Sequence, residues 1–392
     1  MAAVSARAAF RRRAPLMALA LVALLAGMWG ALIRLGLVSS SLAPATSEAH
    51  GPLMALGFLG TLVSLERAVA LRRPWAYLAP LATGLGALAA LAGAPYGSTA
   101  ALLGLGGLVL LADHLLLARI APSAHNSIMG LGAAAWVATC VAWLAGADVG
   151  RFAYLLAGFL VLTIVGERLE LTRVLARPKR VQRVLLSAVA LFACGLALSL
   201  FVRAIGVQIA GIGLLAQAGW LARYDIARRT VRLGGVTRFM AVALLAGYLW
   251  LSVAGALWLL DAPTVDGPAY DAALHAVFLG FVFSMVFAHA PVIVPAVLRT
   301  PMPFDRAFYL PLALLHTSLA LRLLGGDLAG ELALWRWGGV LGGLAILAFL
   351  ALTATKTIKG RNQHEQDRSG REPRRTRRRT TVPSGAVRAP AP

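Results

Sequence analysis

Two histidines, His50 and His275, are the residues best suited to chemistry, because each stands near the start of a long apolar stretch. Ionisable groups inside a membrane are costly and are therefore candidates for function. If both stretches cross a membrane in the same direction, the two imidazoles lie at one depth, where they could hold a b-type haem from its two faces. The alternatives are a site for another metal, or two histidines that only cap their helices at the interface. Glu48, two residues before His50, could orient its ring.

A second pair of histidines, His289 and His316, lies in two consecutive apolar stretches at comparable depth. These rings could bind a second metal of unknown identity, or they could hydrogen-bond each other between neighbouring helices. Three prolines near the pair, Pro291, Pro295 and Pro311, predict kinked helices around an irregular cavity.

Several acidic residues stand beside basic ones near the ends of the apolar stretches. The pairs are Glu66 with Arg67, Glu167 with Arg168, and Asp225 with Arg223. Opposite charges so close in sequence predict mutual neutralisation within each pair, which lowers the cost of placing them in a membrane. The alternative interpretation is functional, because Asp113 and Glu167 leave room for a proton path from the cytoplasm.

The elements that must position these residues are twelve apolar stretches, each about long enough to cross a bilayer as a helix. They cover residues 15–36, 50–71, 75–94, 98–118, 126–146, 150–172, 182–202, 205–224, 238–260, 270–294, 306–325 and 334–355. The backbone of a segment in lipid must satisfy its own hydrogen bonds, so each stretch is predicted to be helical. The expected fold class is therefore an all-α integral membrane protein with about twelve transmembrane helices.

The composition supports a membrane protein and argues against a soluble one. Of the 392 residues 59% are hydrophobic and only 14% charged, and the mean hydropathy is +0.77. A soluble domain carries roughly 25% charged residues. Although the net charge is +21, the basic residues sit in short clusters without a nucleic-acid-binding motif, so the expected partner is the lipid bilayer and not nucleic acid. Cys140 and Cys194 both fall in apolar stretches, which argues against a disulfide.

The distribution of basic residues predicts the orientation. If the N-terminus is cytoplasmic, 32 of the 37 lysines and arginines fall on the cytoplasmic side and 5 on the other. Both termini are therefore expected on the cytoplasmic face of the cell inner membrane. We expect a cytoplasmic N-terminal tail at 1–14, a membrane domain at 15–355 and a disordered basic cytoplasmic tail at 356–392. That tail could anchor the topology or hold anionic lipid headgroups.

A weak internal repeat links three of the stretches. The pairs Gly57-Phe58, Gly158-Phe159 and Gly280-Phe281 recur at separations of 101 and 122 residues, which is four stretches each time. In the first two cases a Glu-Arg pair follows nine residues after the glycine, and in the third His289 stands at that offset. The pattern predicts three repeats of four helices.

The two segments that carry the first histidine pair resemble a known family. Residues 49–58, AHGPLMALGF, and 274–281, LHAVFLGF, are similar to helix starts of the haem–copper oxidase subunit I superfamily, and more closely to those of NnrS-type membrane proteins. NnrS-type proteins contain haem and copper and are linked to the nitric oxide response. The resemblance implies that His50 and His275 are axial ligands of a b-type haem. It does not extend to an oxygen-reducing centre, because Val277 stands where an oxidase has its second histidine, and the sixth stretch holds Glu167 but no copper-binding histidine.

These observations favour a haem-binding membrane protein that acts in electron transfer with a redox partner, or in sensing or handling a diatomic gas such as nitric oxide. Arg34 and Arg336 could then pair with the haem propionates. Whether the chain is an enzyme stays open. The alternative is a secondary transporter, or permease, for a small solute, with Glu66 as its proton-coupling residue; the basic stretch 168–183 resembles a loop that joins two halves of such carriers. A third possibility is an assembly factor without a ligand.

Overall fold

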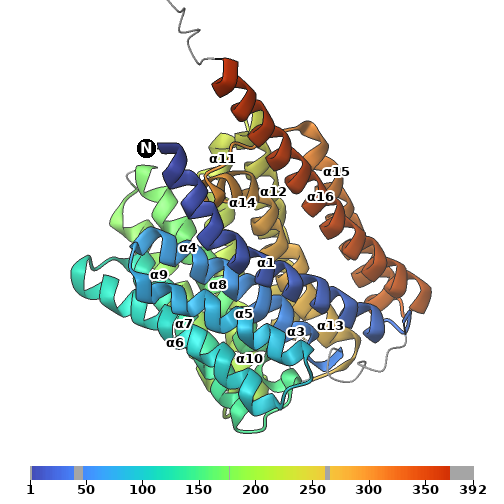
Figure 1. The fold of residues 1–392 in the computed structure, drawn as a ribbon. Helices are drawn as coiled ribbons and strands as arrows, with labels where there is room; N and C mark the ends of the chain where they lie inside the picture. The colour runs from blue at the N-terminus through green and yellow to red at the C-terminus, as the bar shows by residue number, and fades with distance from the viewer. Residues whose placement is uncertain (1, 39–46, 176, 261–264, 371–392) are drawn as a thin grey trace, which may run out of the picture.

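The computed structural model describes residues 2–38, 47–175, 177–260 and 265–370, with side chains from residue 13 to residue 363. The described part is all-α, without a strand, and twelve of its helices are long and apolar enough to cross a membrane (Figure 1). The expected all-α membrane fold with twelve spans is therefore confirmed. The first six spans are formed by α1 (Ala2–Arg34), α3 (His50–Pro52) with η1 (Leu53–Gly60) and α4 (Thr61–Leu71), η2 (Pro74–Tyr77) with α5 (Leu78–Leu91), α6 (Tyr96–Ile120), α7 (Ala124–Leu144), and α8 (Val149–Thr172) with η3 (Arg173–Leu175).

The second six spans follow the same pattern of long helices joined by short connections. They are formed by α9 (Lys179–Ser199), α10 (Arg203–Tyr224), α12 (Gly235–Leu260), α13 (Gly267–His275) with η4 (Ala276–Val282) and α14 (Phe283–Leu298), η5 (Arg306–Phe308) with α15 (Tyr309–Ala320) and η6 (Leu321–Leu328), and α16 (Leu332–Gly370). A short helix, α11 (Ala227–Thr230), joins α10 to α12. Two of the connections leave a helix through a glycine with positive φ, Gly93 after α5 and Gly146 after α7, as is usual where a helix ends.

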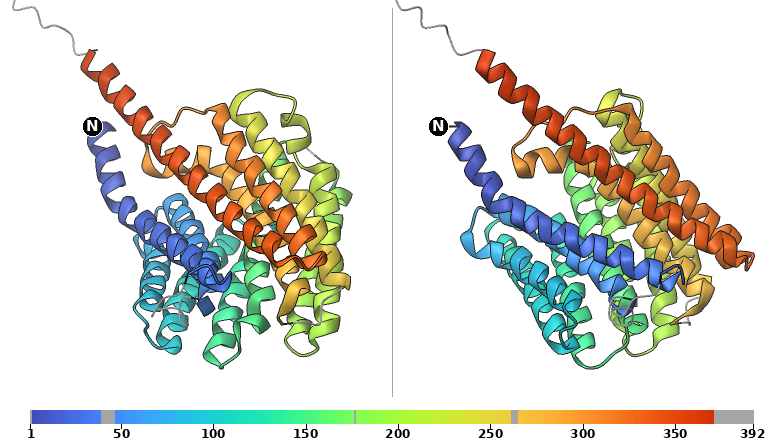
Figure 2. Two further views of the ribbon diagram at one scale, coloured as in Figure 1. Left: turned by 90° about the vertical axis from the view of Figure 1, so that its right-hand side faces the viewer. Right: turned by 45° about the vertical axis from the view of Figure 1, so that its right-hand side comes forward.

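Helix α8 lies at the centre of the bundle, and α1 and α16 lie on its outside. In the most apolar window of α8, 83% of the residues are buried, against 33% for α1 and 28% for α16. The two outer helices run obliquely across one face of the other helices (Figure 2). Lipid is as apolar as the side chains that face it, so outer helices can expose leucines that a soluble protein would bury.

The first and last helices share one end of the bundle. Helix α1 begins and α16 ends at the same end, and the last turns of α16 project beyond the other helices (Figures 1 and 2). The expected disorder from residue 356 is wrong for residues 356–370, which continue α16 without a break; residues 371–392 lie outside the described residues. The expected N-terminal tail is likewise helical from Ala2 onward and continues into the first span.

The second and tenth spans share details that go beyond the sequence repeat. Each contains a π-helical segment around its Gly-Phe pair, η1 in one and η4 in the other. Each also ends at an arginine with left-handed backbone, Arg72 with φ of 57° and Arg299 with φ of 53°. The sixth span has the Gly-Phe pair but remains a regular α-helix there. The three-fold repeat stays a prediction, with its first and third members alike in detail.

Candidate functional site

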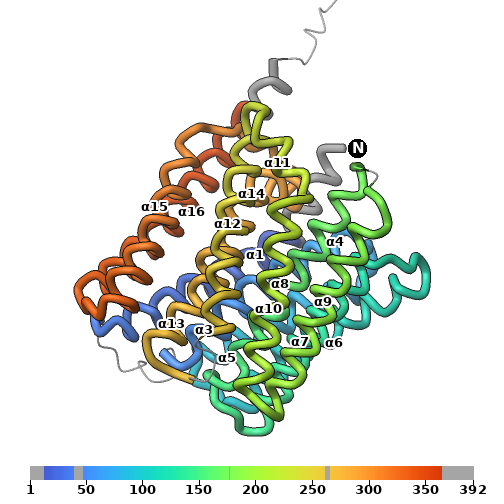
Figure 3. The backbone as a smooth tube through the Cα atoms, turned by 180° about the vertical axis from the view of Figure 1, so that it is seen from behind, coloured from blue at the N-terminus to red at the C-terminus, as the bar shows by residue number. Residues whose placement is uncertain are grey.

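His50 and His275 line one cavity of about 600 Å³ at the end of the bundle away from the chain termini. Helices α3 and α13, which carry the two histidines, both pack against α8 and lie at the same end of the bundle (Figures 1 and 3). The wall also includes residues of α1, α8, η6 and α16. A volume of this size is typical of small-molecule and cofactor sites.

Both rings are held by a backbone carbonyl group through the same nitrogen, Nδ1. The Nδ1–H of His50 donates to the carbonyl oxygen of Gly27 at 2.7 Å, and the Nδ1–H of His275 donates to that of Asp271 at 2.8 Å. A neutral imidazole has one N–H and one lone pair, so these bonds leave the lone pair on Nε2 of each ring. Within the described residues neither Nε2 has a hydrogen-bond partner. Two residues with free Nε2 lone pairs that line one cavity are donors that could ligate a metal.

The expectation that Glu48 orients the His50 ring is wrong. Its carboxylate accepts a hydrogen bond from the hydroxyl of Tyr96 instead, and the His50 ring is held by the backbone of α1. Glu48 still lines the cavity, from an exposed position. The helix that begins just after Glu48 carries His50 toward α1 and leaves the carboxylate facing α6.

Asp271 is the residue of this site that sequence reasoning missed. It lies one helical turn before His275, and its carboxylate comes within 3.2 Å of His275 Nδ1. The same carboxylate accepts hydrogen bonds from Arg322 Nε at 2.8 Å and from Trp335 Nε1 at 3.2 Å. The guanidinium of Arg322 also stacks on the Trp335 ring at 4.6 Å. The spacing of four residues between Asp271 and His275 was the signal that could have found the pair.

Three π-helical segments border the cavity. Segment η1 begins three residues after His50, η4 begins directly after His275, and η6 contains Arg322. Such segments are rare and are frequently found at functional sites. Their wider turns change the direction in which the following side chains point, which sequence periodicity at 3.6 residues does not capture.

The basic residues of the cavity differ in part from the expected pair. Arg34 lines the cavity, but Arg336 does not; its Nε donates to the carbonyl oxygen of Leu35 at 3.1 Å. Arg322, 6% exposed, takes its place in the wall and is paired with Asp271. The rest of the lining is largely apolar, and four glycines of α16 leave room beside it: Gly339, Gly342 and Gly343 in the wall and Gly338 against Arg322.

Comparison with known proteins places the chain in a family without an assigned activity. Residues 13–358 match the family described as "Domain of unknown function (DUF8744)", and that range covers the cavity and nearly all of the twelve spans. The chain belongs to this family. No curated protein matches the sequence.

The second histidine pair of this DUF8744 chain is not arranged as expected. Trp250 Nε1 donates to His316 Nδ1 at 3.0 Å, while His289 donates from Nδ1 to the carbonyl oxygen of Met285 at 2.8 Å. The expected hydrogen bond between the two rings is not formed. Because Nδ1 of His316 accepts, its Nε2 carries the proton and has no lone pair for a metal. The Nε2 of His289 lies 3.4 Å from Arg168 Nη1. The lone pair of this Nε2 therefore accepts a hydrogen bond from the guanidinium and is not free for a metal.

The described residues contain no group of three or more His, Cys, Asp or Glu side chains placed to hold a metal ion. A haem needs only two axial side chains, because the porphyrin supplies the other ligands, so this finding concerns the second metal and not the cavity. Both cysteines are free thiols, as expected.

The acidic residues pair between helices and not with their sequence neighbours. Arg67 contacts Glu167 at 3.4 Å instead of Glu66, and Arg168 binds Asp225 through two bonds of 2.8 Å. The expected pairs within dipeptides are therefore wrong, and so is the pairing of Asp225 with Arg223. Neighbouring residues on a helix point about 100° apart, so they do not face each other. The charges instead join α4 to α8 and α8 to the end of α10.

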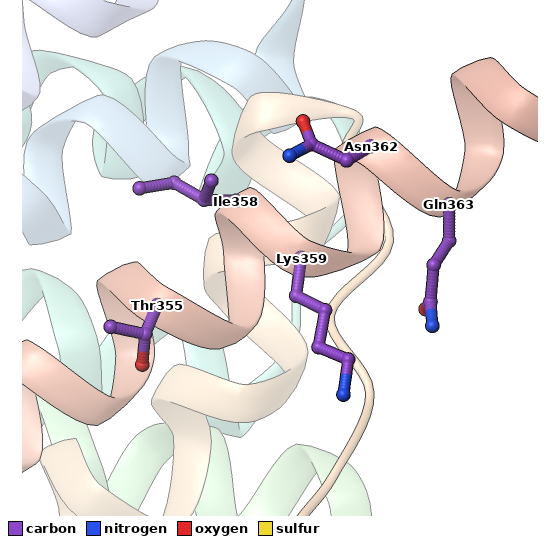
Figure 4. Close-up of a pocket in the computed structure, with 5 residues that line it drawn as sticks. All are labelled: Thr355, Ile358, Lys359, Asn362 and Gln363. Carbon is purple, nitrogen blue, oxygen red and sulfur yellow. The ribbon is translucent and has the colours of Figure 1, made fainter.

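A second hollow lies on the projecting part of α16 and has none of these properties. It is open, and its lining consists of Thr355, Ile358, Lys359, Asn362 and Gln363. Figure 4 shows that these side chains leave the helix in different directions and do not converge on one point. This hollow is the surface of one helix and not a site.

Proposed function

We propose that this protein is a haem-binding integral membrane protein that acts in electron transfer. The observation that carries the proposal is that His50 and His275 line one cavity with both Nε2 lone pairs free. Imidazole nitrogens are common axial ligands of b-type haem iron. The largely apolar lining suits a porphyrin, and Arg34 provides a cation for an acidic group of the ligand.

The supporting residues around His275 favour the same assignment. A histidine that binds a metal usually donates its other N–H to a carbonyl or a carboxylate, which fixes the ring. His275 has both acceptors, the carbonyl oxygen at 2.8 Å and the carboxylate at 3.2 Å from Asp271. A haem bound by these two rings would supply reversible one-electron chemistry. If His50 and His275 both held the iron, the chemistry that the haem would supply is electron transfer rather than direct gas binding.

The test is the absorption spectrum of the full-length protein purified in detergent from cells supplied with a haem precursor. We expect a pyridine haemochrome of b type and a low-spin spectrum. His50→Ala and His275→Ala should each lose haem or give a high-spin form that binds carbon monoxide. His289→Ala is the matched control, because His289 lies on the same span as His275 but outside the cavity. A colourless protein, or spectra that neither cavity variant changes, would refute the proposal.

A secondary transporter for a small solute is the alternative that one observation favours. Discontinuous helices beside a central site are typical of transporters, and η1 and η4 interrupt two spans at the cavity. Proton-coupled uptake by the reconstituted protein, reported by a pH dye inside vesicles and abolished by Glu66→Gln, would favour this function. The transporter hypothesis predicts a haem-free protein, so the absorption spectrum distinguishes the two proposals.

A further inference from the structure

A buried acid in α6 lies apart from the cavity, toward the end of the bundle that carries the chain termini. Asp113 comes seven residues before the end of α6, which is about 10 Å along a helix. Its side chain is 1% exposed, and neither carboxyl oxygen has a hydrogen-bond partner within the described residues. Helix α4, which carries Arg67, packs against α6. On the second span, Arg67 lies 17 residues from His50, or about 25 Å, so this acid and the cavity are separate features.

The elements that pack against α6 offer Asp113 little compensation. Three of the elements that pack against α6 contain no Asp, Glu, Lys or Arg. They are α5 (Leu78–Leu91), η1 (Leu53–Gly60) and α7 (Ala124–Leu144). The titratable groups of α7 are the buried thiol of Cys140 and His125, whose Nε2 lies 3.2 Å from the hydroxyl of Ser123 and 3.9 Å from Glu170. Tyr77 is the titratable residue of η2.

The residue next to Asp113 is fully engaged elsewhere. His114 Nδ1 lies 2.8 Å from the Asn126 amide oxygen, and the Asn126 amide donates to the His114 carbonyl oxygen at 2.9 Å. Asn126 therefore bonds the histidine twice, and no bond from it to the acid is formed. Among the described elements that pack against α6, the basic residue is therefore Arg67 of α4.

Arg67 itself is committed to other groups. Its Nη2 lies 3.0 Å from the Met129 sulfur and 3.4 Å from Glu167 Oε1. The contact with Glu167 is loose, and both side chains are partly exposed, at 17% and 22%. An ionised Asp113 would compete with Glu167 for this guanidinium, whereas a neutral Asp113 leaves the ion pair in place.

We propose that Asp113 is a proton-binding site whose loading is coupled to the Arg67–Glu167 ion pair. An unpaired carboxylate in such an environment is costly, and a proton on one oxygen removes the charge. In the described arrangement the acid carries the proton and Arg67 pairs with Glu167. When the proton leaves as H⁺ to water at this end of the bundle, the carboxylate attracts Arg67 and frees Glu167. Glu66 of α4 and Glu170 of α8, the latter 46% exposed, are further acids along this route.

Infrared spectroscopy of the full-length protein in lipid nanodiscs tests this site across a pH series. We expect a protonated-carboxyl C=O component that persists to higher pH than those of the exposed acids, disappears as the pH rises further, and is missing from Asp113→Asn. Asp113→Asn should keep the thermal stability of the wild type, because an amide resembles the protonated acid. Glu331→Gln, which alters an exposed acid, is the control and should leave the band unchanged.

The coupling is tested by a second variant, Arg67→Gln. Without the guanidinium, the band assigned to Asp113 should persist to higher pH than in the wild type. An Asp113→Asn protein that retains the whole band, or that unfolds because it has lost an ionised partner of Arg67, would overturn the proposal. A band that Arg67→Gln leaves unshifted would overturn the coupling. None of these readouts depends on haem, so the proposal fails or holds independently of the proposed function.

Discussion

Asp271 holds three groups of the cavity wall at once, the ring of His275, the guanidinium of Arg322 and the indole of Trp335. We predict that Asp271→Asn weakens haem binding about 10- to 100-fold, because a residue that orients a metal-ligating histidine typically contributes that much to affinity. Titration of haem into the haem-free protein measures the change. Glu331→Gln is the control at the same end of the bundle. An Asp271→Asn protein that binds haem as tightly as this control would contradict the positioning role.

Arg168 and Asp225 form the most deeply buried ion pair of the described residues, with side chains 2% and 0% exposed. Asp225 also accepts a hydrogen bond from the backbone N–H of Ala227 at 2.7 Å and so supports α11. We predict that Asp225→Asn destabilises the protein by about 3–5 kcal/mol, because it leaves a buried guanidinium without its counter-charge. Thermal unfolding in detergent measures this loss. The exposed Asp148→Asn is the control, and equal melting temperatures for the two variants would contradict the prediction.

The sequence predicts the depth of a single residue in the bundle well, but it does not predict the partner of its side chain. His50 and His275 were expected at one level because both begin spans with the same direction, and they line one cavity. The partners of Glu48 and Arg67 could not be predicted, because they come from helices far away in sequence. Hydropathy places a residue along a helix axis, but only the packing of helices decides what its side chain meets.

At the scale of elements, the close approach of α9 and α10 rests on glycines. A Cβ at Gly195 would lie 2.8 Å from the Cα of Ala210, while a Cβ at Gly219 would have no atom within 4 Å. We predict that Gly195→Ala costs about 1–3 kcal/mol through overpacking. Gly219→Ala, in the middle of α10, should be neutral or stabilising by up to about 1 kcal/mol. Thermal unfolding of the two variants measures both changes in stability. Similar melting temperatures for the two variants would contradict the prediction and show that α9 and α10 can separate at little cost.

The spans themselves were predictable because a backbone in lipid has no alternative to a helix. Most predicted boundaries differ from those of the structure by only a few residues, and the second span, His50–Leu71, agrees at both ends. The last span runs eight residues further than predicted, to Gln363, because helical structure continues where the apolar pattern stops. The π-helical segments were not predicted, since a π-turn changes the hydrogen-bond partner without leaving a clear mark in the apolar pattern.

At the scale of the whole molecule, the beginning of α1 and the end of α16 lie at the same end of the bundle, as an even number of spans requires (Figure 1). The distribution of basic residues predicts which side of the membrane this end faces. In the predicted arrangement, 32 of the 37 lysines and arginines fall on one side of the membrane, in the N-terminal tail, the connections on that side and the C-terminal tail. Such clusters are retained on the cytoplasmic side during insertion.

We therefore predict that this end is cytoplasmic and that the cavity lies toward the opposite face of the membrane. Green fluorescent protein fused after Pro392 or after Arg177 should fluoresce in a bacterial host, because it folds in the cytoplasm. Alkaline phosphatase fused at those positions should be inactive, and it should be active when fused after Asp148, which precedes α8 at the other end. The reverse pattern would turn the cavity toward the cytoplasm. In that case any electron donor for a haem held by His50 and His275 would have to be cytoplasmic rather than extracytoplasmic.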